Sequence, residues 1–550
     1  MKFNFTNITS VLILAFALTI VGCGDDDPTG DNGNGNGNDT PPSISSFEPA
    51  YADFGQEVTI TGENFASNAD DNTVMFAEGV EATVNSASST ELTVTVPEGA
   101  VDGSISVETD AGNAESSGSF AIVPQVYQDL PGNKTLITGD VTWSEDQTLS
   151  GPHFVLPGAT LTVEPGVTVS FEYHEEVADD VGTIITIPGD ETNYTNDRPS
   201  GRLVADGSAD NPIVFTSTRK EVASWGGIIL AGEAPNNVPG GQGEIEGLSE
   251  AVQYGADIDG GQSFDSEDDS GVLSYVQINY SGYSISAGSE LQALTMYSVG
   301  SQTQMDHISI FRSVDDGIEF FGGTNDIKYL VIVDAADDTF DGDNGWQGRG
   351  QFWLGVTTPN YPANRGFEND GCADFSDCDG GRGASEFNVY NTTMWGNNSD
   401  NGETVYGMMI REGITGTYAN NIIANFQKSV GDFLPIHVET DGTENNIGTS
   451  LSFAGNYTWG NTPWDYATSG EPYTAEDVGV TRLTENPFTN ADPANGNFDF
   501  SLVSGSDAAT GGSSVPSDDF YTQVDFSGAV GVKDSENDWI TGANWIKWEN

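Results

Sequence analysis

"DHISIFRSVDDGIEFFGG", residues 306–323, is closely followed by a second phrase of the same pattern, "IKYLVIVDAADDTFDGDNG", residues 327–345. Ile308 in the first phrase corresponds to Leu330 in the second, and a double aspartate follows the apolar run of each, always at an offset of 22 residues. A constant offset of this length is typical of successive coils of a parallel β-helix, in which each repeat stacks on the one before. The two phrases therefore predict neighbouring coils.

Short β runs separated by glycine-rich turns recur throughout residues 124–550, which predicts further coils on both sides of this pair. Examples are "GATLTVEPGVTVSFEY" (158–173) and "GRLVADGSADNPIVFTST" (201–218). Residues 42–123 differ, because segments such as "EVTITG" and "ELTVTVP" alternate apolar and polar side chains between turns. Such alternation is the pattern of a small antiparallel β-sandwich. The predicted fold is all-β, a sandwich followed by a β-helix.

The charge balance excludes one class of partner. The 550 residues include 84 acidic and 16 basic side chains, for a formal net charge of -68. Such a chain repels nucleic acid and anionic membrane surfaces, so we expect no nucleic-acid partner. Adaptation to a saline habitat and loading with divalent cations are two compatible explanations of the charge.

The first residues resemble an export signal. An apolar run from Ile8 to Val21 has the length of a signal-peptide core, which predicts a signal peptide over residues 1–22. The run ends in "IVGC", which resembles a bacterial lipoprotein lipobox and implies acylation of Cys23. The acidic "GDDD" that follows is similar to the surface-export signal of Bacteroidetes-type lipoproteins. We expect a lipid anchor in the cell outer membrane, facing outward, with residues 23–41 as a flexible acidic linker.

Two longer stretches carry a family resemblance. "PSISSFEPAYADFGQEVTITGENF" and "TELTVTVPEGAVDGSISVETDAGNAESSGSFAIV" resemble an IPT/TIG immunoglobulin-like domain, which implies a spacer or interaction module. The positions that match its turns and core are Gly55, Gly62, Phe65, Pro97 and Gly112. "GATLTVEPG", "WGGIILAGEAPNN", "GWQGRGQF" and "GAVGVKDSENDWITGANW" resemble an uncharacterised family of bacterial surface lipoproteins with a right-handed parallel β-helix of the pectin-lyase type. That resemblance implies a fold and surface display, and it implies no settled activity.

The double aspartates are the candidate site. Stacked coils would place Asp315 beside Asp337 and Asp316 beside Asp338, about 5 Å apart. Adjacent carboxylates repel, so the columns need a bound cation, hydrogen bonds from turn amides, or a shared catalytic proton. Further acidic residues follow, and a hard cation such as Ca²⁺ prefers oxygen ligands. The candidate cation ligands are Asp315, Asp316, Asp337, Asp338, Asp341 and Asp343.

A catalytic role for the same residues stays open. β-helix enzymes similar to polygalacturonases hydrolyse glycosidic bonds with clustered aspartates, which makes candidates of Asp315, Asp316, Asp337 and Asp338. Basic residues that would hold an anionic sugar are scarce nearby. They are Arg312, Lys328 and Arg349. A neutral glycan needs no basic residues to hold it, so a glycoside hydrolase or polysaccharide lyase remains an alternative.

Other motifs are structural in our interpretation. Cys372 and Cys378 are close in sequence and extracytoplasmic, which favours a disulfide. The acidic loop at residues 254–271 is a weaker Ca²⁺ candidate than a solvated loop. The four histidines lack metal-binding spacing and do not support zinc chemistry. The many aromatic residues of the second half are expected to fill the coil or cap its open end, with stacking on sugars as the alternative.

The preferred hypothesis is a surface lipoprotein whose acidic β-helix, supported by a cation, binds an extracellular polymer, a glycan or a partner protein. Whether the chain is an enzyme stays open, and binding is favoured over catalysis because basic residues for an anionic sugar are scarce and lyase chemistry needs a positioned base beside the metal. The alternatives are a polysaccharide-degrading hydrolase or lyase, and an accessory subunit of an outer-membrane uptake receptor.

Overall fold

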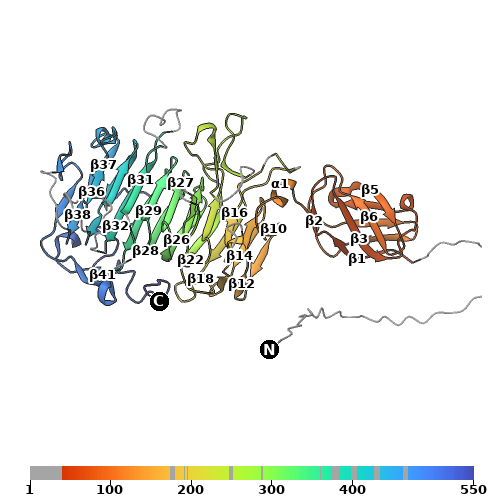
Figure 1. The fold of residues 1–550 in the computed structure, drawn as a ribbon, viewed down its shortest axis with the longest axis horizontal. Coiled ribbons are helices and arrows are strands. Elements are labelled where there is room, and N and C mark those ends of the chain that lie inside the picture. Colours follow the sequence, from red (N-terminus) through yellow and green to blue (C-terminus); the bar gives the residue numbers. More distant parts are fainter. Residues whose placement is uncertain are drawn as a thin grey trace, which may run out of the picture.

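The computed structural model describes residues 40–549 except 174–179, 191, 195, 247–251, 287–288, 360, 364, 373–382, 398–405, 427–433 and 462–468. The predicted signal peptide, Cys23 and most of the linker therefore lie outside the described residues, as does Cys378. In the described part, two β domains follow each other along the chain (Figure 1). The all-β prediction is confirmed.

The first domain is a small antiparallel sandwich. Its sheet has the order β1 (Ser43–Glu48), β3 (Glu57–Glu63), β6 (Glu91–Thr95), β5 (Val80–Ala87), β4 (Thr73–Phe76), β7 (Ser106–Thr109) and β8 (Gly112–Glu115). Side chains alternate in burial along β3, where Val58 and Ile60 enter a core closed by Phe120. A two-strand pair, β2 (Tyr51–Ala52) with β9 (Ala121–Ile122), and the helix α1 (Gln125–Gln128) lead to the second domain.

The second domain is a parallel β-helix built from two long sheets. The ten-stranded sheet runs β10 (Thr135–Ile137), β13 (Pro152–Val155), β16 (Thr183–Thr186), β19 (Ile228–Ala231), β25 (Leu294–Tyr297), β27 (Ile318–Phe321), β29 (Asp338–Asp343), β31 (Arg365–Asp370), β33 (Tyr406–Arg411) and β36 (Ile436–Val438). The main path of the sixteen-stranded sheet runs β11 (Val141–Trp143), β14 (Thr160–Val163), β17 (Arg202–Asp206), β22 (Gly271–Ser281), β26 (Gln304–Ser313), β28 (Ile327–Ala335), β30 (Arg349–Val356), β32 (Glu386–Trp395), β35 (Ile422–Ala424), β38 (Asn456–Trp459) and β39 (Val480–Arg482). Its side branches are β12 (Gln147–Leu149), β15 (Thr168–Phe171), β18 (Ile213–Ser217), β34 (Thr415–Ala419) and β37 (Leu451–Ala454). Neighbouring strands pair in parallel throughout both sheets.

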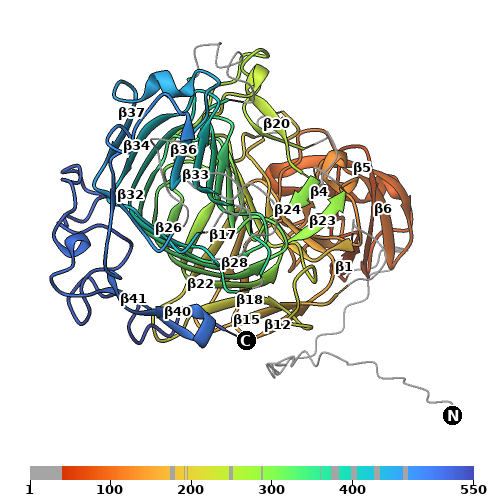
Figure 2. The ribbon, with the colours of Figure 1, turned by 60° about the vertical axis from the view of Figure 1, so that its left-hand side comes forward.

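Three short antiparallel hairpins accompany the β-helix. They are β20 (Gln242–Glu244) with β21 (Gln253–Gly255), β23 (Tyr283–Ser286) with β24 (Ser289–Leu291), and β40 (Phe488–Asp492) with β41 (Asn497–Leu502). The first two lie in the long connections between coils, as Figure 2 shows.

The predicted register is confirmed for the pair of phrases that opens the sequence argument. Ile308 of β26 pairs with Leu330 of β28, at the expected offset. The offset does not continue, because Val276 precedes Ile308 in the same ladder by 32 residues and Trp353 follows Leu330 by 23. Turns can lengthen without disturbing the stacked strands, so coil length varies while register persists.

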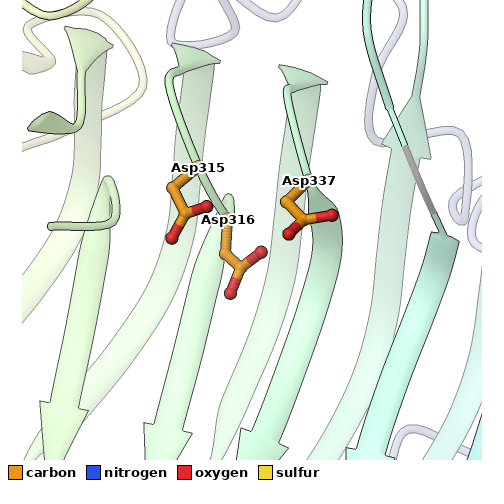
Figure 3. Close-up of side chains that lie close together, drawn as sticks. All are labelled: Asp315, Asp316 and Asp337. Carbon is orange, nitrogen blue, oxygen red and sulfur yellow. The ribbon is translucent and has the colours of Figure 1, made fainter. Parts of the chain in front are cut away.

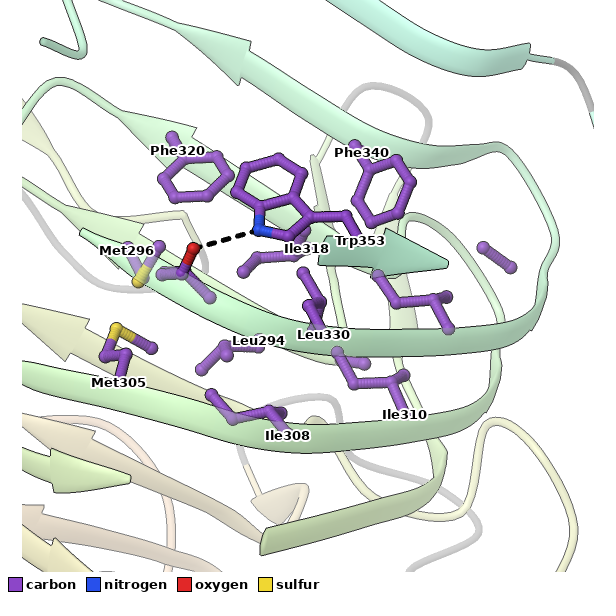
Figure 4. Packing of buried hydrophobic residues seen from close by; sticks show 14 of the residues in the cluster. Leu294, Met296, Met305, Ile308, Ile310, Ile318, Phe320, Leu330, Phe340 and Trp353 are labelled. Atoms are coloured by element: carbon purple, nitrogen blue, oxygen red, sulfur yellow. Dashed lines mark hydrogen bonds between the residues drawn. The ribbon is translucent and has the colours of Figure 1, made fainter. Parts of the chain in front are cut away.

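Large apolar side chains fill the inside of the coil. Trp346, Trp353, Phe320 and Phe340 are fully buried there, and the indole N–H of Trp353 donates to the carbonyl of Ile327 at 3.0 Å (Figure 4). The expectation that aromatic residues fill the coil is confirmed for these tryptophans.

The C-terminal segment, residues 483–549, covers the outer face of the sixteen-stranded sheet rather than the open end of the coil. Its backbone bonds to Asn420 at Ser513, to Asn391 at Phe526 and to Ser309 at Lys547, so it runs back along the coils. Aromatic rings of this segment pack on Tyr275, His307 and Tyr329. The tryptophans near the C-terminus therefore seal a side of the β-helix.

Candidate functional site

The candidate site lies on the outer face of the ten-stranded sheet. Along β27, Ile318 and Phe320 point into the coil, so Glu319 between them faces outward. The ladder pairs Glu319 with Asp341 and Asp341 with Glu368 on consecutive coils. Parallel stacking thus places three carboxylates in one row, about 4.8 Å apart.

The turn before β27 adds a second group of carboxylates. Asp315 and Asp316 precede β27, and Asp337 holds the equivalent place before β29 (Figure 3). Carboxylate oxygens of these three residues lie within 4.8 Å of one another. Asp316 is buried, Asp315 is half-buried and Asp337 is exposed, so the group reaches from the sheet to solvent.

Asp316 also belongs to a second, more deeply buried triad. Oxygens of Asp316, Glu319 and Asp341 lie within 4.8 Å of one another. Asp316 is 5% exposed and Glu319 is 8% exposed. One carboxylate oxygen of Glu319, Oε2, has no hydrogen-bond partner. The two triads share Asp316, so they form one continuous acidic cluster.

Backbone amides neutralise part of this cluster. The Asp338 N–H donates to Asp316 Oδ1 at 2.8 Å, and the Gly342 N–H donates to Asp341 Oδ1 at 2.6 Å. The Asn344 N–H likewise donates to Asp343 at 2.5 Å. Turn capping, one of the three arrangements expected from the sequence, is therefore present. It satisfies one oxygen of each carboxylate and supplies no full positive charge.

Burial and mutual repulsion shift the titration of these groups. Burial raises the pKa of Asp316, Glu319 and Asp341 well above the usual range for carboxyls, and neighbouring carboxylates raise it further. Burial and the Asp337 carboxylate raise the pKa of Asp315 to about 6. Burial raises the pKa of Glu246, which reaches the site from the loop before β21, to about 7. A proton or a cation is therefore favoured here at neutral pH.

On the next coils, arginine side chains form ion pairs with the carboxylates. Arg365 lies 3.2 Å from Asp338 and also contacts Glu368. Arg411 binds Glu368 at 2.8 Å and Asp370 at 2.5 Å. Asp338 thus pairs with a guanidinium, although the sequence placed it among the cation ligands.

The rest of the cluster has no such cation. Within the described ranges, none of six carboxylates takes part in an ion pair: Asp315, Asp316, Glu319, Asp337, Asp341 and Asp343. Of these, only Glu319 was missed in the sequence. The signal was present, because Glu319 lies 22 residues before Asp341, at the offset that aligns the two phrases.

The remaining predicted sites have different outcomes. Cys372 is disulfide-bonded, and its expected partner, Cys378, lies outside the described residues. In the acidic loop, Asp257 and Asp265 accept backbone N–H groups two or three residues on, as turn caps do. Asp268 of that loop is buried against Ser200. These aspartates of the loop thus make structural contacts, whereas the sequence favoured a solvated loop.

Comparison with known families now adds to this geometry. A family model described as a pectate-lyase like beta helix domain matches residues 135–498, more than half of the chain. The chain belongs to this family. The pectate-lyase-like β-helix domain contains every carboxylate of the acidic cluster. A second model, the IPT/TIG domain, matches residues 42–122, which confirms the sandwich.

Whole-protein comparisons add little to the pectate-lyase-like assignment. No curated protein matches the chain. A solved structure described as an auxiliary nutrient binding protein from Bacteroides thetaiotaomicron is 30% identical over 16% of this chain and 21% of its own, with a TM-score of 0.15. Another from Bacteroides ovatus, described in the same words, is 20% identical over 16% and 22%, with a TM-score of 0.15. The chain thus spans about a fifth of the length of these structures. Among the described residues, no helix is long and apolar enough to cross a membrane.

Proposed function

We propose that this chain is a surface binding protein, held at the outer face of the outer membrane by an acylated Cys23. In this proposal, the IPT/TIG domain is a spacer, and the acidic cluster of the β-helix binds a divalent cation. The loaded cluster binds an extracellular polymer or a partner protein. The lipobox-like "IVGC" and the acidic residues after it support the anchor.

One observation supports a bound divalent cation most directly. Glu319 keeps an unpartnered oxygen in a buried position beside Asp316 and Asp341, with no ion pair in the described structure. Oxygens of the three carboxylates lie within 4.8 Å of one another, and two ionised carboxylates at that limit repel by about 3.5 kcal/mol at an effective dielectric constant of about 20. Turn amides offset only part of that repulsion. A divalent cation between the three carboxylates would convert it into attraction.

Ca²⁺ fits this donor set better than other metals. The ligands are all carboxylates, and the histidines and cysteines that Zn²⁺ prefers are absent from both triads. Mg²⁺ keeps much of its water shell, whereas Ca²⁺ accepts about six to eight oxygens in irregular geometry. A crowded and largely buried set of carboxylates therefore favours Ca²⁺.

The exposed end of the cluster suggests how a ligand would be held. Asp337 is exposed and Asp315 is half-buried, so a cation shared by these residues would face solvent on one side. Hydroxyl or carboxylate oxygens of an extracellular polymer could complete its coordination there. Binding in this way needs no reaction.

The alternative of a hydrolase or lyase has less support. Carboxylates that attack or protonate a glycosidic bond must touch the sugar, and among the four catalytic candidates Asp315 and Asp337 reach solvent, whereas Asp316 is buried. Asp338, the fourth catalytic candidate, is engaged by Arg365. We therefore place binding before catalysis. Association with an outer-membrane uptake receptor remains compatible with a binding role.

Calorimetric titration of the full-length chain with Ca²⁺ tests the proposal. We expect saturable binding, and we expect Asp316→Asn with Asp341→Asn to abolish it. Asp210→Asn is the matched control, because Asp210 is exposed and far along the chain from the cluster. A glycan array probed in Ca²⁺ and in EGTA then tests polymer binding. Ca²⁺ binding that persists in the double variant would refute the cluster as the site.

A further inference from the structure

A second feature of the β-helix is a pocket that gathers basic residues in this acidic chain. A cavity of about 520 Å³ is lined by Lys220, Glu221, Val222, Tyr280, Arg312 and Tyr361. Such a volume suits a small ligand or part of a glycan. Lys220 follows β18, and Tyr280 and Arg312 are the next-to-last residues of β22 and β26, so the ends of three strands of the sixteen-stranded sheet build one wall.

The stacking of the coils brings Tyr280 and Arg312 together. The residues on either side of them pair across β22 and β26, so Tyr280 and Arg312 hold equivalent corner positions on consecutive coils. Asp334 follows at the same corner of the next coil and accepts a hydrogen bond from Arg312 Nε at 3.3 Å. Asp334 also accepts bonds from the Thr358 N–H and hydroxyl at 2.7 and 2.8 Å. It is thus occupied, while the rest of the Arg312 guanidinium is available to the pocket.

A third basic residue reaches this place from the C-terminal segment. The Lys547 ammonium lies 5.6 Å from the centre of the Phe311 ring. Phe311 directly precedes Arg312 in the sequence. Burial lowers the pKa of Lys547, the positive charges of Lys220 and Arg312 lower it further, and the Glu549 carboxylate raises it. Figures 1 and 2 both show the C-terminus beside β18 and β22.

Of these three cations, Arg312 is paired with Asp334. In the described part of the chain, neither Lys220 nor Lys547 takes part in an ion pair. Glu221, which is exposed, is the acidic residue that lines the pocket, and Glu549, whose charge raises the pKa of Lys547, lines a different pocket with Trp548. Charges beyond about 8 Å are screened at physiological salt, so the local cations govern the pocket despite the net charge of the chain.

Aromatic surface completes the pocket. Tyr361 donates its hydroxyl to the Ser313 carbonyl at 2.9 Å, which fixes its ring, and the Arg312 guanidinium lies 5.8 Å from that ring centre. Val222 is 36% exposed at the rim. Fixed aromatic rings offer an apolar face to the C–H groups of a sugar, while the cations meet an anionic substituent.

We infer that this pocket binds a sulfated saccharide. Lysines act as point charges, and Arg312 keeps its two terminal amino groups after its Nε donates to Asp334. The three terminal oxygens of a sulfate ester can accept from these separate donors in different directions, whereas a carboxylate offers two oxygens in one plane. The inference goes beyond the Ca²⁺-supported function, because it uses neither triad and concerns a different sheet.

Calorimetry of the full-length chain with three tetrasaccharides tests the inference. The probes are a sulfated one from κ-carrageenan, an unsulfated one from agarose and tetragalacturonate. In EGTA we expect only the sulfated probe to bind, with the same affinity when Ca²⁺ is present, and we expect Lys220→Gln or Tyr361→Ala to weaken its binding about tenfold or more. Lys533→Gln, which removes a cation paired with Asp499, is the control and should leave binding unchanged.

Each other result decides against the inference. Equal binding of tetragalacturonate in EGTA would overturn the assignment to sulfate, and equal loss in Lys533→Gln would show that only net charge matters. Undiminished binding in both pocket variants would overturn the pocket as the site. Sulfate binding that requires Ca²⁺ would assign it to the acidic cluster instead.

Discussion

The backbone N–H of Asp338 donates to the carboxylate of Asp316 on the preceding coil at 2.8 Å. This bond ties together the two double aspartates that the sequence repeats. The side chain of Asp338 turns to Arg365 instead, at 3.2 Å. Like residues in a repeat thus take different partners: Asp316 lies among carboxylates, whereas Asp338 has Arg365, which it shares with Glu368.

Glu319→Gln should stabilise the protein when Ca²⁺ is absent. The change keeps the shape of the side chain and removes one charge from a buried group of three carboxylates, so we expect a gain of roughly 1–3 kcal/mol in EGTA. It should also remove the stabilisation by Ca²⁺, which reaches about 2.7 kcal/mol at one hundred times the dissociation constant.

Urea unfolding followed by tryptophan fluorescence measures this effect on the β-helix, because all 10 tryptophans lie after residue 142. Asp210→Asn, at an exposed site, should change the free energy of unfolding by less than about 0.5 kcal/mol. Destabilisation of Glu319→Gln in EGTA would contradict the idea that repulsion dominates.

Acidification should raise stability in EGTA between about pH 7.5 and 5.5. The folded-state pKa values of Asp315 and Asp343 are raised to about 6 and that of Glu246 to about 7, while unfolded carboxyls titrate near pH 4. Within that window the folded protein binds more protons, so the free energy of unfolding falls as pH rises, by at most about 1.4 kcal/mol per pH unit for each group.

Melting temperatures across this range, with and without Ca²⁺, provide the measurement. Saturating Ca²⁺ should reverse the trend, because the ion competes with protons for the same oxygens. A flat profile in EGTA would show that these carboxyls are solvated enough to ionise freely.

Arg365→Ala should destabilise the β-helix strongly. Asp338 is buried and Arg365 is largely buried, so the variant leaves a buried carboxylate without its cation, at a cost of about 3–5 kcal/mol. Adding Asp338→Asn should recover part of the loss. Urea unfolding of both variants is the measurement.

Arg202→Ala is the matched control for that pair. Arg202 and Asp269 are each about one third exposed, and such pairs contribute at most about 1 kcal/mol. Equal losses in Arg202→Ala and Arg365→Ala would show that the burial of the second pair is energetically unimportant.

Trp545→Ala should release the C-terminal segment. The Trp545 ring is buried, meets His307 edge-on at 5.3 Å and stacks on Trp539 at 5.9 Å, so the variant loses about 3 kcal/mol of packing. Because this segment is packed on the coils rather than paired in their sheets, we expect local opening.

Limited proteolysis followed by mass spectrometry should therefore show cleavage after residue 483 with the rest of the β-helix intact. Val503→Ala, a change at an exposed residue of the same segment, should leave the cleavage pattern as in the wild type. Resistance of Trp545→Ala to proteolysis would mean that the hydrogen bonds to Ser309, Asn391 and Asn420 hold the segment alone.

Much of the fold could be predicted from local patterns. The pairing of Ile308 with Leu330 followed from a single repeat, because neighbouring coils of equal length keep equivalent residues in register. The neighbouring coils differ in length, as Val276 and Trp353 show, so sequence periodicity alone could not align them. Sequence reasoning also expected the aromatic residues of the second half to fill the coil or cap its open end, whereas Trp545 packs on its side.

The sequence by itself determined the two β domains, the acidic character and the repeat that brings aspartates together. These depend on side-chain alternation, turn residues and composition, which are local properties of the chain. Only the tertiary structure decided which carboxylates are neutralised, because Arg365 comes from the coil after Asp338 and Arg411 from a later one. It likewise joined Lys220, Arg312 and Lys547 from three distant segments, since the charge around a residue depends on its neighbours in space.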